Sequence, residues 1–208
     1  MILGRLREPA VSVRALLADT GARFRHATAS GRYDFEHELI FALRPRNGAP
    51  GVNFLTPLRM GHGDTALLVN RGWVYSPDGM SLDLARWRES DSAYVDGFVE
   101  RFTPAEIDVT TSSVSRAVRR LDADSIQARI PYPLLPLVLV QQQGRDSEAT
   151  TGTPVRVDPP PLSEGPHRSY AIQWFGFALT GIVGTLLVAA RDRRRISPRI
   201  VHDGERIG

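Results

Sequence analysis

The sequence contains no cysteine and no lysine. Without cysteine, the chain can form no disulfide, no thiolate metal site and no thiol nucleophile. Without lysine, Schiff-base chemistry and the phosphate-binding lysine of a P-loop are excluded. The chain also lacks an H-E-x-x-H pair, a phosphate-cradling glycine loop and a G-x-S-x-G elbow. We therefore expect a protein that is not an enzyme.

The excess of positive charge is confined to one end of the chain. The formal net charge is +3, with 26 basic and 23 acidic residues. Six of the arginines and three of the acids lie in residues 191–208, so residues 1–190 hold 20 of each and are neutral. A nucleic-acid-binding domain normally gathers basic residues on one face. We therefore expect no nucleic-acid partner.

A long apolar run precedes this basic tail. Residues 170–190 are 21 consecutive positions without a formal charge. As a helix they would span roughly the 30 Å of a bilayer core. The arginine cluster at residues 191–195 favours a cytoplasmic carboxyl end under the positive-inside rule. The sequence predicts a transmembrane helix at 169–190 and a cytoplasmic tail at 191–208; the alternative is a buried helix of a soluble core.

This topology would place the rest of the chain on the opposite side of the membrane, so that part must be exported. The first 23 residues carry four arginines and no long apolar run, so they do not resemble a signal peptide or a membrane helix. We therefore expect a first transmembrane helix that is absent from this chain and encoded upstream of Met1.

Residues 28–158 have the pattern of a β-rich domain. Short apolar or alternating segments are separated by glycine- and proline-bearing turns, without helices between them. This pattern predicts a mainly β fold, an antiparallel barrel or a sandwich with short helices. A helical segment is expected within 1–27, over residues 9–24, and a helical turn within 121–130. A proline-rich connector is expected at 159–168. The strands are expected at 29–33, 36–43, 52–58, 66–74, 93–102, 137–142 and 154–157.

Four segments together resemble the surfeit-locus-one family of cytochrome c oxidase assembly factors. They are Gly-Arg-Tyr at 31–33, Thr-Pro-Leu at 56–58 and Val-Asn-Arg-Gly-Trp-Val at 69–74, followed by His-x-x-Tyr-Ala-x-x-Trp-Phe at 167–175. The resemblance implies two transmembrane helices flanking an extracytoplasmic domain in the inner (plasma) membrane. It also implies a haem a cofactor, with His167 as the iron ligand. The implied partners are the catalytic subunit of the oxidase, the lipid bilayer and, as a further candidate, the haem a synthesis machinery.

Helical spacing supports a haem site at the start of the membrane segment. In a helix that begins near His167, this residue shares a face with Tyr170, Ala171 and Trp174. An imidazole nitrogen and two amphipathic rings at the membrane surface would suit a flat apolar macrocycle. The alternative is that His167 is only an interfacial polar aromatic residue, and that the protein is a cofactor-free, membrane-anchored interaction scaffold.

Other polar residues give weaker signals. Arg71 could bind a haem propionate, because guanidinium pairs with carboxylates, but a structural role is the favoured alternative. We expect His37 to lie in a strand, where its neighbours point to the opposite face and cannot share a metal with it. The remaining histidines, at 26, 62 and 202, are assigned with it to solvated surface.

Overall fold

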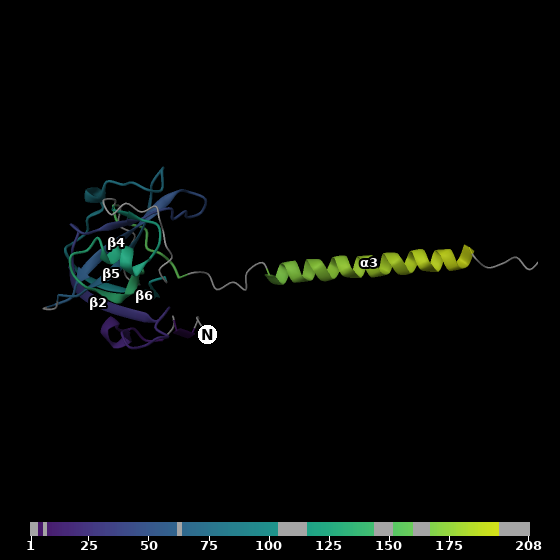
Figure 1. Cartoon of the computed structure of the whole chain (residues 1–208), viewed down its shortest axis with the longest axis horizontal. Helices are drawn as coiled ribbons and strands as arrows, with labels where there is room; N and C mark the ends of the chain where they lie inside the picture. The colour runs from purple at the N-terminus through teal and green to yellow at the C-terminus, as the bar shows by residue number, and fades with distance from the viewer. Residues whose placement is uncertain are drawn as a thin grey trace, which may run out of the picture. The chain divides into compact units, whose positions relative to one another are not determined.

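The computed structural model describes residues 4–5, 8–61, 64–103, 116–143, 152–159 and 167–195. It divides into two compact units, Met1–Pro160 and Pro161–Gly208 (Figure 1). The first is a β-domain and the second contains one long helix.

Five strands of the β-domain close into a barrel. Hydrogen-bonded neighbours run in the order β2, β6, β8, β5, β4, and the pairing of β4 with β2 completes the circle. A mainly β barrel was predicted from the spacing of short apolar segments, and this prediction is confirmed. The bounds of the barrel strands are β2 His26–Tyr33, β4 Gly51–Arg59, β5 Ala66–Tyr75, β6 Ser92–Arg101 and β8 Leu134–Gln141.

Shorter elements flank the barrel. Three of them extend the sheet: β1 pairs with β2, β3 pairs with β4, and β7 pairs with β3. Asp122 caps α2, its carboxylate accepting a hydrogen bond from the Ser125 amide at 2.8 Å, as expected for a helical turn in this region. The bounds are β1 Val11–Ser12, η1 Val13–Leu16, β3 Leu39–Phe41, η2 Leu84–Trp87, β7 Ala117–Val118 and α2 Ala123–Gln127.

One junction of the barrel is parallel. β5 pairs with β8 in the parallel sense, whereas the other four pairs of the ring are antiparallel. Parallel neighbours need a long crossover, and here the chain from β5 to β8 includes β6 and α2. A crossover of this kind leaves no local turn signal, so the sequence pattern did not predict it.

Alternation along the strands separates the two larger of the three apolar clusters. One cluster fills the barrel with every second residue of its strands, such as Leu67 and Val69 of β5 and Val99 of β6. The other lies on the outer face, where Leu68 of β5 and Val138 of β8 pack against Ile126 of α2. The strands are therefore apolar on both faces over much of their length.

Three local predictions were wrong. The helix expected over 9–24 is a two-residue strand, a 3-10 turn and further turns, because Val13 and Leu16 face the core at a three-residue spacing and the chain then turns into β2. The strand expected over 36–43 contains only Leu39–Phe41. In the segment 154–157, Val155 forms an isolated antiparallel bridge with Trp73 rather than a strand.

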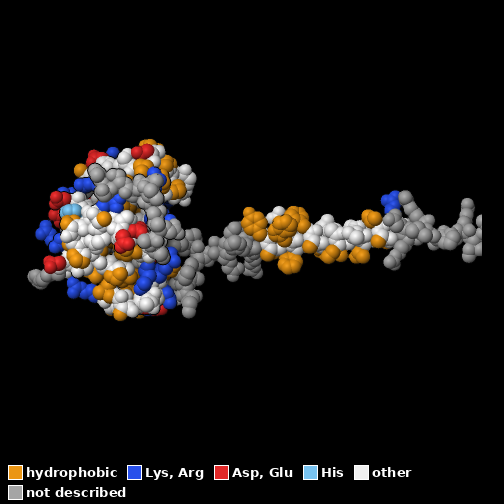
Figure 2. All heavy atoms as spheres, in the orientation of Figure 1, with side chains coloured by type: hydrophobic (Ala, Val, Ile, Leu, Met, Phe, Trp, Pro, Cys, Tyr) orange, Lys and Arg blue, Asp and Glu red, His pale blue; other side chains and the backbone are white. Residues whose placement is uncertain are grey.

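The second unit contains α3, His167–Arg195, a helix of 29 residues. Its segment Tyr170–Arg191 has 22 residues and a mean hydropathy of 1.7, which is long and apolar enough to cross a membrane. Figure 2 shows hydrophobic side chains along the length of this helix. Most of the proline-rich connector lies outside the described residues, as do His62 and His202.

Candidate functional site

The predicted haem face begins where α3 begins. His167 is the first residue of the helix, so the backbone follows helical geometry from that position onward. Tyr170, Ala171 and Trp174 follow at three, four and seven residues, which places them on the same face as His167. The condition on which the predicted face depended, helical geometry from His167, is thus met.

The aromatic side chains of this face project away from the helix. Tyr170 is 58% exposed and Trp174 is 70% exposed. The Trp174 and Phe177 rings are in edge-to-face contact, with centroids 6.0 Å apart. Their apolar surface is therefore available to lipid, to another protein or to a flat ligand.

Arg71 occupies a different environment, inside the β-domain. It lies on the same face of β5 as Leu67 and Val69, the residues that face the barrel interior, and it is 0% exposed. The rings of Phe35 and Phe54 each have their centroids 5.0 Å from its guanidinium carbon. A charged side chain this deeply buried needs partners for all of its donors.

The partners of Arg71 use all five of its N–H groups. Nε donates to Thr56 Oγ1 at 2.8 Å, and Nη2 donates to both carboxylate oxygens of Glu38 at 2.9 Å. Nη1 donates to the Trp87 carbonyl at 3.1 Å and to Glu89. These contacts support the structural alternative for Arg71, because no donor is left for a propionate.

Arg156 extends this network. Its guanidinium donates to both Glu89 oxygens and to the Arg71 carbonyl. The segment around Val155 lies so close to β5 that a glycine is required at position 72. The φ of Gly72 is +133°, and an added Cβ would lie 2.5 Å from the Val155 carbonyl oxygen. The two arginines balance Glu38 and Glu89. Sequence reasoning did not identify Glu38, Glu89 or Arg156, although an arginine inside an apolar strand is a signal that buried acids must lie nearby.

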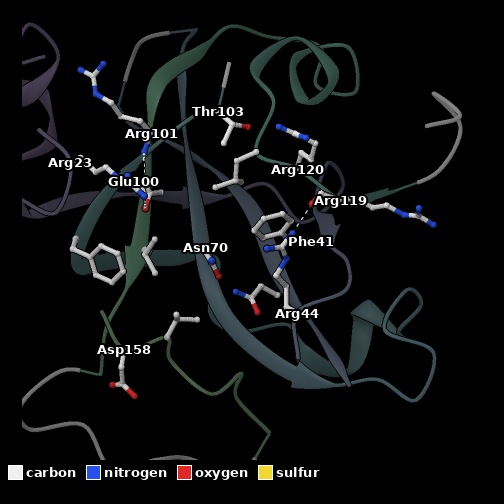
Figure 3. Close-up of a pocket in the computed structure, with 15 residues that line it drawn as sticks. Arg23, Phe41, Arg44, Asn70, Glu100, Arg101, Thr103, Arg119, Arg120 and Asp158 are labelled. Atoms are coloured by element: carbon white, nitrogen blue, oxygen red, sulfur yellow. Dashed lines mark hydrogen bonds and ion pairs between the residues drawn. The ribbon is translucent and has the colours of Figure 1, made fainter. Parts of the chain in front are cut away.

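The β-domain also has a pocket with a volume of about 520 Å³ on the outer face of the barrel (Figure 3). Its lining combines apolar side chains such as Phe41 and Phe98 with arginines such as Arg44 and Arg119. No residue of this pocket was predicted as a site, because its members are far apart in the sequence and come together only through strand pairing.

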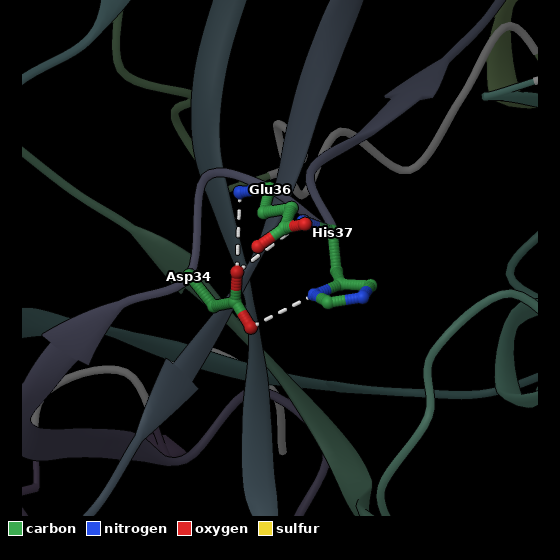
Figure 4. Close-up of side chains that lie close together, drawn as sticks. All are labelled: Asp34, Glu36 and His37. Carbon is green, nitrogen blue, oxygen red and sulfur yellow. Dashed lines mark hydrogen bonds and ion pairs between the residues drawn. The ribbon is translucent and has the colours of Figure 1, made fainter.

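Asp34, Glu36 and His37 form a compact polar group after β2 (Figure 4). His37 lies in a turn and not in a strand, so the prediction that it cannot lie beside its neighbours was wrong. Asp34 Oδ1 accepts from the amides of Glu36 and His37, and Oδ2 accepts from Tyr132 Oη at 2.7 Å and from His37 Nδ1 at 2.9 Å. These bonds explain the cluster as a capped turn.

The same bonds set the charge of Asp34. Burial raises the pKa of its carboxyl, but the hydrogen bonds from Tyr132 and His37 outweigh burial and hold the pKa below its usual value. His26 is likewise not simply solvated: its Nε2 contacts the Asp96 carboxylate on the neighbouring strand, and its side chain is 28% exposed. Both histidines are half-buried and anchored by an aspartate, which corrects their assignment to open surface.

Comparison with known families gives one match. A model of the SURF1 family matches residues 4–179, which include the whole β-domain and the first turns of α3. This chain belongs to the SURF1 family. None of the curated proteins compared with the chain matches it.

Membership confirms the resemblance drawn from the four sequence segments. SURF1 family members are assembly factors for cytochrome c oxidase and are associated with membranes. This SURF1 family member accordingly has a role in oxidase assembly, and α3 supplies a helix suited to a membrane. The match extends to residue 179, so it includes His167, Tyr170 and Trp174.

Proposed function

We propose that this protein is a membrane-anchored assembly factor that holds haem a at the start of α3. It assists insertion of the haem into the catalytic subunit of cytochrome c oxidase, or maturation of that subunit. The observation that carries the proposal is the helix start: α3 begins at His167, and Tyr170 and Trp174 follow on the same face with exposed rings.

The residues of this face fit a haem. Imidazole is a common axial ligand of haem iron, and His167 supplies one. Ala171 and Ala178 are small and exposed, so a flat macrocycle can approach the helix. Tyr170 and Trp174 offer ring contacts and polar tips that suit a membrane surface. Arg71 is left out of this site because its donors are engaged within the barrel.

An open site suits a carrier. A haem that is to be passed on must be released as well as held. The side chains of Tyr170 and Trp174 are exposed and form an open face, not an enclosed pocket. With His167 as the one protein ligand, release would require only the bond between its imidazole and the iron to break. In this proposal the protein would bind and orient the haem and present it to the receiving subunit.

The orientation of α3 belongs to the same proposal. Arginines gather at the carboxyl end of the helix, and such clusters remain on the cytoplasmic side. The end that begins with His167 then lies at the opposite surface of the inner (plasma) membrane, on the side of the β-domain. The haem a synthesis machinery is a natural donor at that surface and the catalytic subunit is the acceptor.

Spectroscopy of the purified full-length protein tests the proposal. Protein from cells that make haem a should show a Soret band, and His167→Ala should lose it. His26→Ala is the matched control, because it removes an imidazole from the β-domain and should retain the band. A colourless wild-type protein would contradict haem binding and would favour the alternative of a cofactor-free interaction scaffold.

A further inference from the structure

The pocket on the outer face of the barrel has a floor that crosses five strands. Phe98 of β6 lies opposite Val140 of β8, which lies opposite Asn70 of β5. Asn53 of β4 lies opposite Phe41 of β3. Asn53 shares the outer face of β4 with Leu55, and Asn70 shares the outer face of β5 with Leu68, so both asparagines line the pocket. The floor is thus apolar at its two ends and carries amides at its centre.

The central amides have unused hydrogen-bonding capacity. Asn53 and Asn70 are each only 6% exposed. Asn70 Oδ1 accepts a hydrogen bond from the Gly72 amide at 3.2 Å, whereas Asn53 Oδ1 is buried without a partner among the described residues. An unpaired buried acceptor is costly, and a ligand that carries N–H groups would relieve that cost.

Positive charge dominates the rim of the pocket. Five arginines line it, against the two acids Glu100 and Asp158. Glu100 is paired with Arg23 at 2.7 Å, and Asp158 with Arg46 at 3.4 Å. In Figure 3, Arg23 and Arg101 lie on one side of Asn70, and the other three arginines, 44, 119 and 120, lie on the opposite side, where no acid lines the pocket.

Arg44 is held in a fixed orientation. Its guanidinium carbon lies 3.6 Å from the centroid of the Phe41 ring. Nε donates to the Ala42 carbonyl at 3.1 Å, and Nη2 donates to the Arg119 carbonyl at 2.6 Å. A stacked guanidinium with a fixed plane loses little entropy when it binds a carboxylate. Arg119, whose side chain is exposed, adds a second cation at the same end.

We infer that this pocket docks an extended acidic segment of a partner protein. The segment places apolar side chains on the floor between Phe98 and Phe41, and its acidic residues lie over Arg44 and Arg119. Its backbone N–H groups face the central amides. Charge, apolar floor and amide acceptors are thus all matched by one ligand class.

The width of the floor favours a peptide over a small carboxylate. Five strands are separated by four spacings of about 4.8 Å, so the floor measures at most about 19 Å along the curved sheet. An extended chain advances about 3.3 Å per residue, so up to about six residues cross it. A single-ring carboxylate would reach only one end. A partner segment also agrees with a role in oxidase assembly, and the inference does not depend on haem binding.

Selection from a randomised hexapeptide library on phage, against the full-length protein in detergent, tests this inference. Selected peptides should combine apolar residues with Asp or Glu concentrated toward one end. A labelled peptide of the consensus sequence is then titrated by fluorescence anisotropy. Arg119→Gln should weaken its binding about fivefold, in the range of an exposed ion pair, and Arg119→Glu should weaken it further. The control Arg32→Glu changes an exposed cation on β2, outside the pocket, and should leave the affinity unchanged.

Three results would overturn the inference. The first is a selection without acidic enrichment. The second is equal binding to the wild type and to Arg119→Glu. The third is complete displacement of the peptide by 2-naphthoate at comparable affinity, which would assign the pocket to a small molecule. Because the assay uses haem-free protein and peptide, its failure is separate from any failure of the Soret experiment.

Discussion

Replacing Arg71 by methionine should expose the cost of an unpaired carboxylate inside the barrel. Glu38 is 1% exposed, and Arg71 donates to both of its oxygens. Methionine keeps much of the apolar stem but provides no donor. Glu89 keeps Arg156 as a partner, so the principal loss falls on Glu38. Breaking one side of a buried ion pair costs about 3 to 5 kcal/mol.

Protonation of Glu38 sets an upper limit on that cost and makes it depend on pH. Converting a glutamate of pKa about 4.3 to its neutral form at pH 7 costs about 3.7 kcal/mol, and at pH 5 about 1 kcal/mol. Burial already raises the pKa of Glu38 in the wild type, although Arg71 lowers it, and without Arg71 the pKa in the folded state lies further above the unfolded value. The folded state is therefore penalised increasingly as pH rises above the unfolded pKa. The destabilisation should therefore lie below this limit of about 3.7 kcal/mol at pH 7, and should fall to about 1 kcal/mol or less at pH 5.

Urea unfolding of the full-length protein, followed by near-ultraviolet circular dichroism at both pH values, measures this difference. Arg23→Met is the control, because the pair of Arg23 with Glu100 has the arginine side chain 57% exposed and should contribute no more than about 1 kcal/mol. The reasoning is refuted if Arg71→Met is no more destabilising than Arg23→Met, or if its effect is the same at pH 5 and pH 7.

Three further predictions follow from other parts of the molecule. Gly97→Ala should destabilise the barrel by about 3 kcal/mol or more, since the added Cβ would meet a carbonyl oxygen of β8; an unchanged urea midpoint would contradict this. The pKa of Asp34 is lower in the folded state than in the unfolded state. Its contribution to the free energy of unfolding is therefore complete above the unfolded-state pKa and is lost as pH falls through the folded-state pKa. Tyr132→Phe should thus unfold at higher pH than the wild type on acid titration, and equal midpoints would count against the capped turn. Because the chain has no cysteine, single cysteines are unambiguous labels: in intact cells an impermeant maleimide should label Ser169→Cys but not Ser197→Cys, and the reverse pattern would invert the proposed orientation.

The barrel was predictable from its strands because the signal is local. Apolar runs such as residues 66–74, bounded by turn residues, mark strands wherever they pair. Which strands become neighbours is not local: the parallel pairing of β5 with β8 joins segments separated by the whole of β6 and α2. The same limit explains the wrong prediction of a helix over 9–24. There Val13 and Leu16 face the core at a three-residue spacing, which resembles the spacing of a helix.

For the candidate sites, too, the sequence predicted local features but not contacts between distant segments. That His167, Tyr170 and Trp174 share one face of α3 could be predicted, because they lie within eight consecutive positions of one helix; haem binding at this face stays a prediction. Arg71 was singled out, but its role was decided by Glu38 and Glu89, which approach it from other parts of the chain. The arginine-rimmed pocket could not be predicted from the sequence, because the residues of its floor come from five separate strands.

The central claim is that His167 is needed to supply haem to the oxidase. The most direct measurement is the haem a content and activity of cytochrome c oxidase in membranes of a strain that lacks this gene. Wild-type protein and His26→Ala should restore both. His167→Ala, present at the same level in the membrane, should restore markedly less. Full restoration by His167→Ala would contradict the account.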